Sequence, residues 1–149
     1  MSLDRQLCFA LYASSRAMTR AYQPMLRELG ITYPQYLVLL LLWQWGREGK
    51  PSDAWTVSAL GESLMLDSGT LTPLLKRMEM QNLLTRRRGV ADERVTLVSI
   101  TDTGRGLESK VKVWREAALG QLGVAPERLS ALHRELWVLL DALQANIKN

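Results

Sequence analysis

The sequence predicts a mostly α-helical chain with one small β-hairpin, an α+β fold class. Apolar residues recur at the three- and four-residue spacing of helices over most of its 149 residues. Between residues 83 and 100 the spacing changes to the alternation typical of strands. Two short helical segments joined by a tight turn come directly before that stretch. Together these observations predict a winged helix-turn-helix flanked by N- and C-terminal dimerisation helices.

The composition predicts a single domain over residues 1–149, because a chain of this length with 47% hydrophobic residues can bury one good core. The formal net charge of +4 is mildly favourable for a polyanionic partner. One cysteine excludes an internal disulfide and no secretory leader pattern is present, so we expect a cytoplasmic protein. The longest apolar run, Tyr36 to Trp43, is far shorter than the ~20 residues that cross a bilayer, so no membrane partner is expected.

The residue types needed for metal or hydrolytic chemistry are scarce. One histidine and one cysteine cannot supply a multi-ligand Cys/His site, and the chain has no glycine-rich phosphate loop and no nucleophile elbow. We therefore expect neither an enzyme nor a metal or other cofactor. The histidine, His133, has no partner motif and is expected to be an ordinary surface or interface residue.

The first third of the chain predicts two helices. Apolar residues at helical spacing cover residues 3–29, where Pro24 should kink or divide the helix and Gly30 should end it. Thr32 predicts the cap of a second helix over 33–45. That helix is apolar almost all round and should be central to the core.

Two shorter helices are predicted next, over about 57–64 and 68–81, followed by a hairpin over 83–100 with a long tip. Pro73 falls inside the second of these helices. A proline there is tolerable only if the first turn starts late, near Gly69 or Thr70, or if the helix is kinked.

The last third predicts two long helices, one from Asp102 to about Leu119 and one opened by Pro126. The last helix carries a leucine seam at alternating three- and four-residue spacing: Leu129, Leu132, Leu136, Leu139 and Leu143. Such a seam requires a partner helix.

The order of elements assigns residues 54–100 to a DNA-binding lobe and residues 1–45 and 101–149 to dimerisation helices. An unrelated small α+β domain is the alternative. Basic side chains favour the DNA-binding interpretation, since residues 76–94 hold six basic against three acidic residues. A solvated surface run is the competing explanation for that cluster.

The second short helix and the hairpin supply the candidate DNA contacts. Hydroxyls at a helix N-terminus can bond phosphates or base edges, and lysine and arginine supply charge. The candidates are Ser68, Thr70, Thr72, Lys76, Arg77 and Arg86.

The stretch "RRRGVADERVTLVSITDTG" resembles the wing signature of the MarR family of regulators, an Asp-x-Arg followed by a strand and a Leu-Thr-x-x-Gly helix start. Here Asp92 and Arg94 form the first part, and Ile100, Thr101 and Gly104 form the second, with isoleucine replacing leucine. The resemblance implies a dimeric repressor whose wing arginine, Arg94, reaches the minor groove and is steadied by Asp92.

Two further stretches, "LDSGTLTPLLKRME" and "TYPQYLVLL", resemble the organic hydroperoxide resistance (OhrR) type of that family. This type senses hydroperoxides with a cysteine near the start of its first helix. The resemblance implies that Cys8 is the sensing thiol and that Tyr12, Tyr22 and Tyr33 form its pocket. It departs from part of the group because no second cysteine can resolve an oxidised Cys8. The alternatives for oxidised Cys8 are reaction with a small-molecule thiol, closure onto a backbone nitrogen, further oxidation to sulfinic and sulfonic acids, and a Cys8–Cys8 bond between subunits.

Helix geometry adds an argument about Cys8 and Tyr22. The fourteen residues between them return to the same helix face but extend roughly 21 Å along a straight helix. Tyr22 should therefore meet the partner's Cys8 if two first helices pack antiparallel about a two-fold axis. Phenol hydrogen bonds there favour the reactive thiolate.

Three hypotheses follow. The first is a homodimeric repressor that binds a pseudo-palindromic operator and releases it when an organic hydroperoxide oxidises Cys8, with a low-molecular-weight thiol available to form a mixed disulfide. The second is a repressor of the same fold released by a reversible phenolic ligand, with Cys8 only structural. The third, a thiol peroxidase, lacks a resolving cysteine and a catalytic pocket signature.

Overall fold

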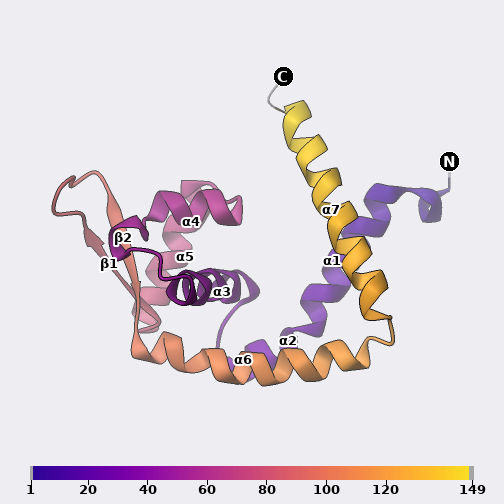
Figure 1. Cartoon of the computed structure of the whole chain (residues 1–149), viewed down its shortest axis with the longest axis horizontal. Coiled ribbons are helices and arrows are strands. Elements are labelled where there is room, and N and C mark those ends of the chain that lie inside the picture. The colour runs from indigo at the N-terminus through magenta and orange to yellow at the C-terminus, as the bar shows by residue number, and fades with distance from the viewer. Residues whose placement is uncertain (1, 148–149) are drawn as a thin grey trace. The chain divides into compact units, whose positions relative to one another are not determined.

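The computed structural model describes residues 2–147, which form seven α-helices, two short 3-10 helices and two strands (Figure 1). The described residues divide into two compact units, one up to Val113 and one from Trp114 on. The boundary falls inside a helix. The mostly α-helical class with one hairpin is confirmed.

The N-terminal helix is divided, as Pro24 predicts. A 3-10 turn at Leu3–Arg5 precedes α1 (Leu7–Ala21), and α2 (Gln23–Leu29) begins with the proline in its first turn, where no intrahelical donor is needed. Gly30 ends α2 in the left-handed conformation, with φ 67°.

The helix α3 (Tyr33–Arg47) forms the centre of the first unit. A capping box fixes its start: Thr32 Oγ1 accepts from the Gln35 N–H, and the Gln35 side chain accepts from the Thr32 N–H. Its inner residues Val38 and Leu39 are fully buried. It runs two residues beyond the predicted end.

The helix-turn-helix consists of α4 (Val57–Leu64) and α5 (Ser68–Met80). Both helices contact α3 and each other. The predicted start of α5 at Ser68 is confirmed, with the Asp67 carboxylate as its cap, and the late start near Gly69 or Thr70 that would have accommodated Pro73 does not occur. The carbonyl that Pro73 cannot bond belongs to Gly69, an exposed first-turn residue whose carbonyl water can solvate.

The hairpin pairs β1 (Leu84–Arg88) with β2 (Thr96–Ile100) in antiparallel register, Leu84 opposite Ile100 and Arg86 opposite Val98. The residues before α4, which include a 3-10 turn at Ser52–Ala54, extend this sheet through a bridge between Thr56 and Leu97. The side chains of Leu84, Val98 and Ile100 are buried against the core.

The helix α6 (Asp102–Gln121) starts against the base of the hairpin. Thr101 Oγ1 accepts from the Gly104 N–H at 3.0 Å and donates to the Asn82 carbonyl at 2.6 Å. The Trp43 indole N–H of α3 donates to the Gly104 carbonyl at 3.1 Å. The Thr-x-x-Gly part of the wing signature, Thr101 to Gly104, therefore has a structural role, because its hydrogen bonds hold the start of α6 to the base of the hairpin and to α3.

The C-terminal unit contains the end of α6 and α7 (Pro126–Ile147). No residue of α7 is buried within the chain, and the same is true of α1. Large apolar side chains on α7 are exposed: Leu132, Leu136, Trp137, Val138 and Leu143.

We predict that Gly104→Ala lowers the free energy of unfolding by roughly 2–3 kcal/mol, as expected for overpacking against backbone. A Cβ at Gly104 would lie 2.2 Å from the Leu83 carbonyl oxygen. Gly106→Ala in the same helix is the control, because no atom lies within 4 Å of its Cβ position, and it should stabilise the chain by about 0.5–1 kcal/mol. Urea denaturation measures the free energy of unfolding of both variants. Equal values would contradict the close contact between Gly104 and the Leu83 carbonyl.

Candidate DNA-binding face and thiol site

The exposed candidates on α5 fall on two stripes. At 3.6 residues per turn, Ser68, Thr72 and Lys76 follow one another along one side of the helix. All three are exposed, whereas Leu71 and Leu75 are buried in the core. This stripe can reach a groove without disturbing the packing of the helix.

The N-terminus of α5 is already occupied by an acidic cap. Asp67 Oδ1 accepts from the Thr70 N–H at 2.8 Å, and the Thr70 hydroxyl donates to Oδ2 at 3.2 Å. The bond from the Thr70 N–H, followed by that from its hydroxyl, holds the pKa of the Asp67 carboxyl below its usual range. A negative charge therefore lies where the sequence predicted that hydroxyls could bind phosphate.

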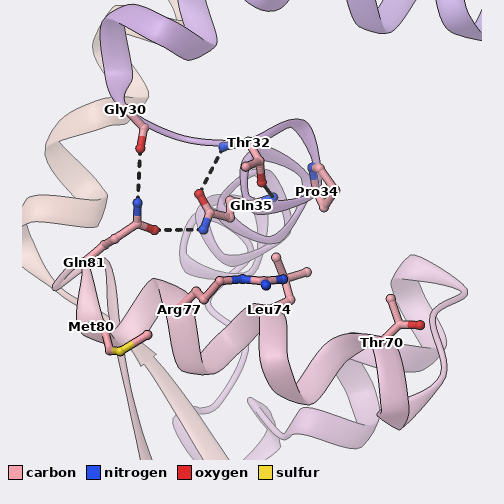
Figure 2. A pocket seen from close by; sticks show the side chains of 9 residues that line it. All are labelled: Gly30, Thr32, Pro34, Gln35, Thr70, Leu74, Arg77, Met80 and Gln81. Atoms are coloured by element: carbon pink, nitrogen blue, oxygen red, sulfur yellow. Dashed lines mark hydrogen bonds between the residues drawn. The ribbon is translucent and has the colours of Figure 1, made fainter.

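Thr70 and Arg77 lie on the second stripe, which faces a hollow of about 710 Å³ between α5 and the turn joining α2 to α3. Figure 2 shows both on α5, with Gly30, Thr32 and Pro34 on the opposite wall. The structure therefore separates these two residues from the stripe of Ser68, to which the sequence had joined them.

The tip of the wing, which is the hairpin of β1 and β2, holds the Arg94 guanidinium in a fixed orientation. Arg94 donates to Asp92 through its backbone N–H (3.0 Å), its Nε (3.0 Å to Oδ1) and its Nη2 (3.1 Å to Oδ2). The side-chain bond from Arg94 is the largest cause that holds the pKa of the Asp92 carboxyl below its usual range, and Asp92 in turn raises the pKa of Arg94. The arginine is 91% exposed. Asp92 therefore orients a charged side chain that makes no other hydrogen bond or ion pair within residues 2–147.

The arginines of β1 have different environments. Arg86 is turned toward α5, where its backbone N–H, Nε and Nη2 all donate to the Glu79 carboxylate. These bonds, the backbone one first, hold the pKa of Glu79 below its usual range. Arg88 donates to the Glu93 carbonyl at 2.8 Å, which holds the wing tip.

Arg87 lies between these two residues and is exposed on the outer side of the strand. Arg87 belongs to the basic cluster of residues 76–94 but was not among the predicted DNA contacts. Strand alternation alone was a usable signal, because Arg86 must face opposite to Arg87.

The aromatic rings of Tyr22, Tyr33 and Tyr36 form a cluster around the turn from α2 to α3. Tyr22 lies edge-on to Tyr33 with ring centroids 5.4 Å apart, and Tyr36 is 5.5 Å from Tyr22 and 5.8 Å from Tyr33. Burial, and secondarily the Tyr22 phenol, raises the pKa of Tyr33. Tyr36 is buried and was not predicted, because its position inside an apolar run gave no functional signal.

Cys8 and Tyr12 lie at the other end of α1. Cys8 is exposed. The Arg16 guanidinium lies 5.4 Å from the Tyr12 ring centroid, next to a small groove that Phe9 also lines. Within one chain, the structure thus brings Tyr22 and Tyr33 together and leaves Cys8 and Tyr12 on an unburied helix.

His133 accepts a hydrogen bond at 3.0 Å from the Trp137 indole N–H, one turn along α7. Residues 2–147 contain no cluster of three acidic, histidine or cysteine side chains that could hold a metal ion. None of the helices in that range has the length and apolar character needed to cross a membrane.

An exposed helix of a helix-turn-helix next to an arginine-tipped wing defines a DNA-binding regulator. Comparison with known proteins agrees. Residues 20–111 match the family model "Transcriptional regulator SarA/Rot". The organic hydroperoxide resistance transcriptional regulator of Bacillus subtilis (strain 168) is 50% identical over 143 residues, covering 96% of this chain and 92% of that protein.

Solved structures give the same result. Reduced AbfR bound to DNA superposes with a TM-score of 0.74 at 35% identity, and overoxidised AbfR bound to DNA with 0.73 at 36%. Each match covers 95% of this chain and 94% of the AbfR chain, and AbfR is a protein of Staphylococcus epidermidis. The chain belongs to the MarR family of winged helix-turn-helix transcriptional regulators, in its organic hydroperoxide resistance type.

We predict different effects for neighbouring wing arginines. Arg87→Ala should lower the salt dependence of DNA binding by about one released counterion, and Arg94→Ala should cost on the order of 1–3 kcal/mol of operator affinity. Arg86→Ala should instead lower the free energy of unfolding slightly and leave the salt dependence unchanged, because it removes both side-chain bonds to Glu79. Fluorescence anisotropy over a salt series, together with urea denaturation, separates these effects. A salt slope that changes in Arg86→Ala but not in Arg87→Ala would contradict this assignment.

Proposed function

We propose that this chain is a redox-responsive repressor that binds operator DNA in its reduced form and releases it when an organic hydroperoxide oxidises Cys8. The observation that carries the proposal is the position of the only cysteine, exposed on a helix that buries nothing within its own chain. The relative from Bacillus subtilis, half identical over nearly the whole chain, supports the hydroperoxide as oxidant.

The DNA contacts divide between two elements. Ser68, Thr72 and Lys76 of α5 enter the major groove, and Arg94 of the wing enters the minor groove in the orientation that Asp92 fixes. Arg87 supplies charge to a phosphate. Because its partner is chromosomal DNA, we place the protein in the cytoplasm.

A homodimer follows from the apolar side chains that the chain leaves uncovered. Leu7 and Met18 on α1, and Leu132 and Leu136 on α7, are exposed. Isolated helices with such faces are stabilised by packing against a partner. Two copies then present two equivalent wings and two recognition helices, the recognition helix being α5. This arrangement matches a pseudo-palindromic operator.

The thiol pocket is proposed to form between subunits. If the two α1 helices pack antiparallel, the Tyr22 and Tyr33 phenols of one subunit reach Cys8 of the other, with Tyr12 beside it. The raised pKa of Tyr33 supports this role, because the phenol then remains a protonated donor at the pH where a thiolate forms.

In the oxidation step, the thiolate sulfur attacks the terminal oxygen of the hydroperoxide R–O–O–H. A sulfur–oxygen bond forms, the oxygen–oxygen bond breaks, and sulfur loses two electrons. The departing alkoxide takes the hydroperoxide proton and leaves as the alcohol ROH, so that Cys8 becomes a sulfenate. In this proposal each Cys8 thiolate reacts with one hydroperoxide molecule, as a sensor does, and is not regenerated in the same reaction.

With no second cysteine, the sulfenic acid condenses with a small thiol, which gives a mixed disulfide and water. We propose that this adduct is the releasing form, because its bulk cannot be accommodated in a packed dimer seam. The overoxidised AbfR bound to DNA supports the distinction, because that relative binds DNA in a state that carries extra oxygen. A repressor released by a reversible ligand is not favoured by these relatives.

Cys8→Ser tests the function directly. The variant should bind operator like the reduced wild type and should no longer be released by cumene hydroperoxide with free cysteine as the small thiol. The measurement is operator anisotropy before and after oxidant, with intact-protein mass to follow the thiol. Undiminished release from Cys8→Ser would refute the proposal.

The tyrosines give a further prediction. Tyr22→Phe and Tyr33→Phe each remove a donor to the thiolate and keep the ring, so the pKa of Cys8 should rise and its oxidation should slow. The alkylation rate of Cys8 against pH measures this, and operator binding by the reduced variants should hardly change.

The control is a mixed dimer with Cys8→Ser in one chain and Tyr22→Phe in the other. Its remaining thiol should behave like wild type, because the tyrosine facing it comes from the other subunit. Identical alkylation curves for wild type and both single variants would contradict the pocket.

A further inference from the structure

One glutamine at the end of the recognition helix is bonded to both sides of the turn between α2 and α3. Gln81, the C-cap of α5, donates from Nε2 to the Gly30 carbonyl at 3.2 Å. Its Oε1 accepts from Gln35 Nε2 at 2.8 Å. Figure 2 shows its side chain between these two groups, on one edge of the hollow.

The far side of this link carries the tyrosine cluster. Gln35 is buried, with a relative exposure of 3%, and belongs to the capping box of α3. Its side chain is therefore held in place by the start of that helix. Tyr33 lies in the same first turn of α3, and its ring contacts that of Tyr22. A displacement of Tyr33 therefore displaces the residue that bonds Gln81.

On the side of α5 that faces the hollow, within residues 2–147, no packed side chains join α5 to the start of α3 beside the Gln81 hydrogen bonds. The buried face of α5, including Leu71 and Leu75, packs against the core, but its Arg77 side faces the hollow of about 710 Å³. Hydrogen bonds across a gap have directional requirements that apolar contacts lack. The Gln81 bonds therefore tie this end of α5 directly to the start of α3, in addition to the packing of the buried Met78.

We infer that Gln81 is a positioning residue that couples the tyrosine end of α3 to α5, so that displacement of the Tyr33 ring by the bulk of the adduct on oxidised Cys8 shifts α5 out of its DNA-binding position. The inference rests on the function proposed above. It requires no contact between Gln81 and either DNA or thiol. Coupling of this kind acts through an element with two arrangements, here the start of α3.

The test compares Gln81→Met with Gln44→Met. Methionine keeps the length of the side chain and removes both bonds of Gln81. Gln44 is an exposed glutamine of α3 that bonds only Glu48 of the same helix end, which makes it a matched control. A third variant, Gln81→Glu, keeps the acceptor for Gln35 and loses the donor to Gly30.

The measured quantity is the ratio of operator dissociation constants for oxidised and reduced protein, with cumene hydroperoxide and free cysteine as reagents. Gln81→Met should lower that ratio by about tenfold, the size of two net hydrogen bonds, and Gln81→Glu should lower it less. Gln44→Met should match wild type. The rate of Cys8 oxidation should be the same in all four proteins. A merely structural role would alter stability and leave the ratio unchanged, and an unchanged ratio in Gln81→Met overturns the inference.

A double-mutant cycle separates this inference from the proposed function. Operator affinity of the reduced protein is measured for Tyr33→Leu, Gln81→Met and the double variant. Non-additive effects support the link, and additive effects overturn it. If wild type is oxidised at Cys8 yet keeps its operator, the proposed function fails, and the cycle still decides whether Gln81 transmits a change at Tyr33.

Discussion

The helix that carries the thiol has no core of its own, and the proposed function depends on that constraint. Within one chain, α1 buries none of its residues, and its apolar side chains are left for a second copy to cover. In the proposed dimer, a thiol on such a helix lies at the interface whose packing holds the two subunits together. Oxidation of Cys8 would then act directly on the geometry of the dimer, without a separate ligand-binding domain.

Much of the fold follows from local sequence signals, because caps and periodicity act over a few residues. Gly30 and Thr32 ended and started helices as expected, and Pro24 divided the first one. Asp92 and Arg94 are close in sequence, so their ion pair could be anticipated from the motif. The start of α5 at Ser68 also agrees with the expectation, and the cap Asp67 keeps it there despite a proline inside the helix.

The parts of the site that escaped prediction depend on long-range contacts. Gln35 and Gln81 lie 46 positions apart, and no periodicity relates them. Arg86 was grouped with the DNA-contacting residues because charge alone does not show that Glu79 lies beneath the strand. The helical period alone separates Thr70 and Arg77 from the Ser68 stripe, but it does not show the hollow that these two residues face, because that hollow forms between α5 and the turn that joins α2 to α3.

Because α5 begins with the acidic cap Asp67, the strength of DNA binding and the choice of operator sequence would depend on different parts of the molecule. In the proposed complex with DNA, a carboxylate at the helix start disfavours phosphate there, so α5 would contribute through base edges and the wing would supply most of the attraction to the DNA backbone. Substitutions along the Ser68 stripe can then change which operator is preferred while the overall strength of DNA binding stays nearly constant. Regulators built in this way can acquire new target promoters during evolution without first passing through a form that binds no DNA.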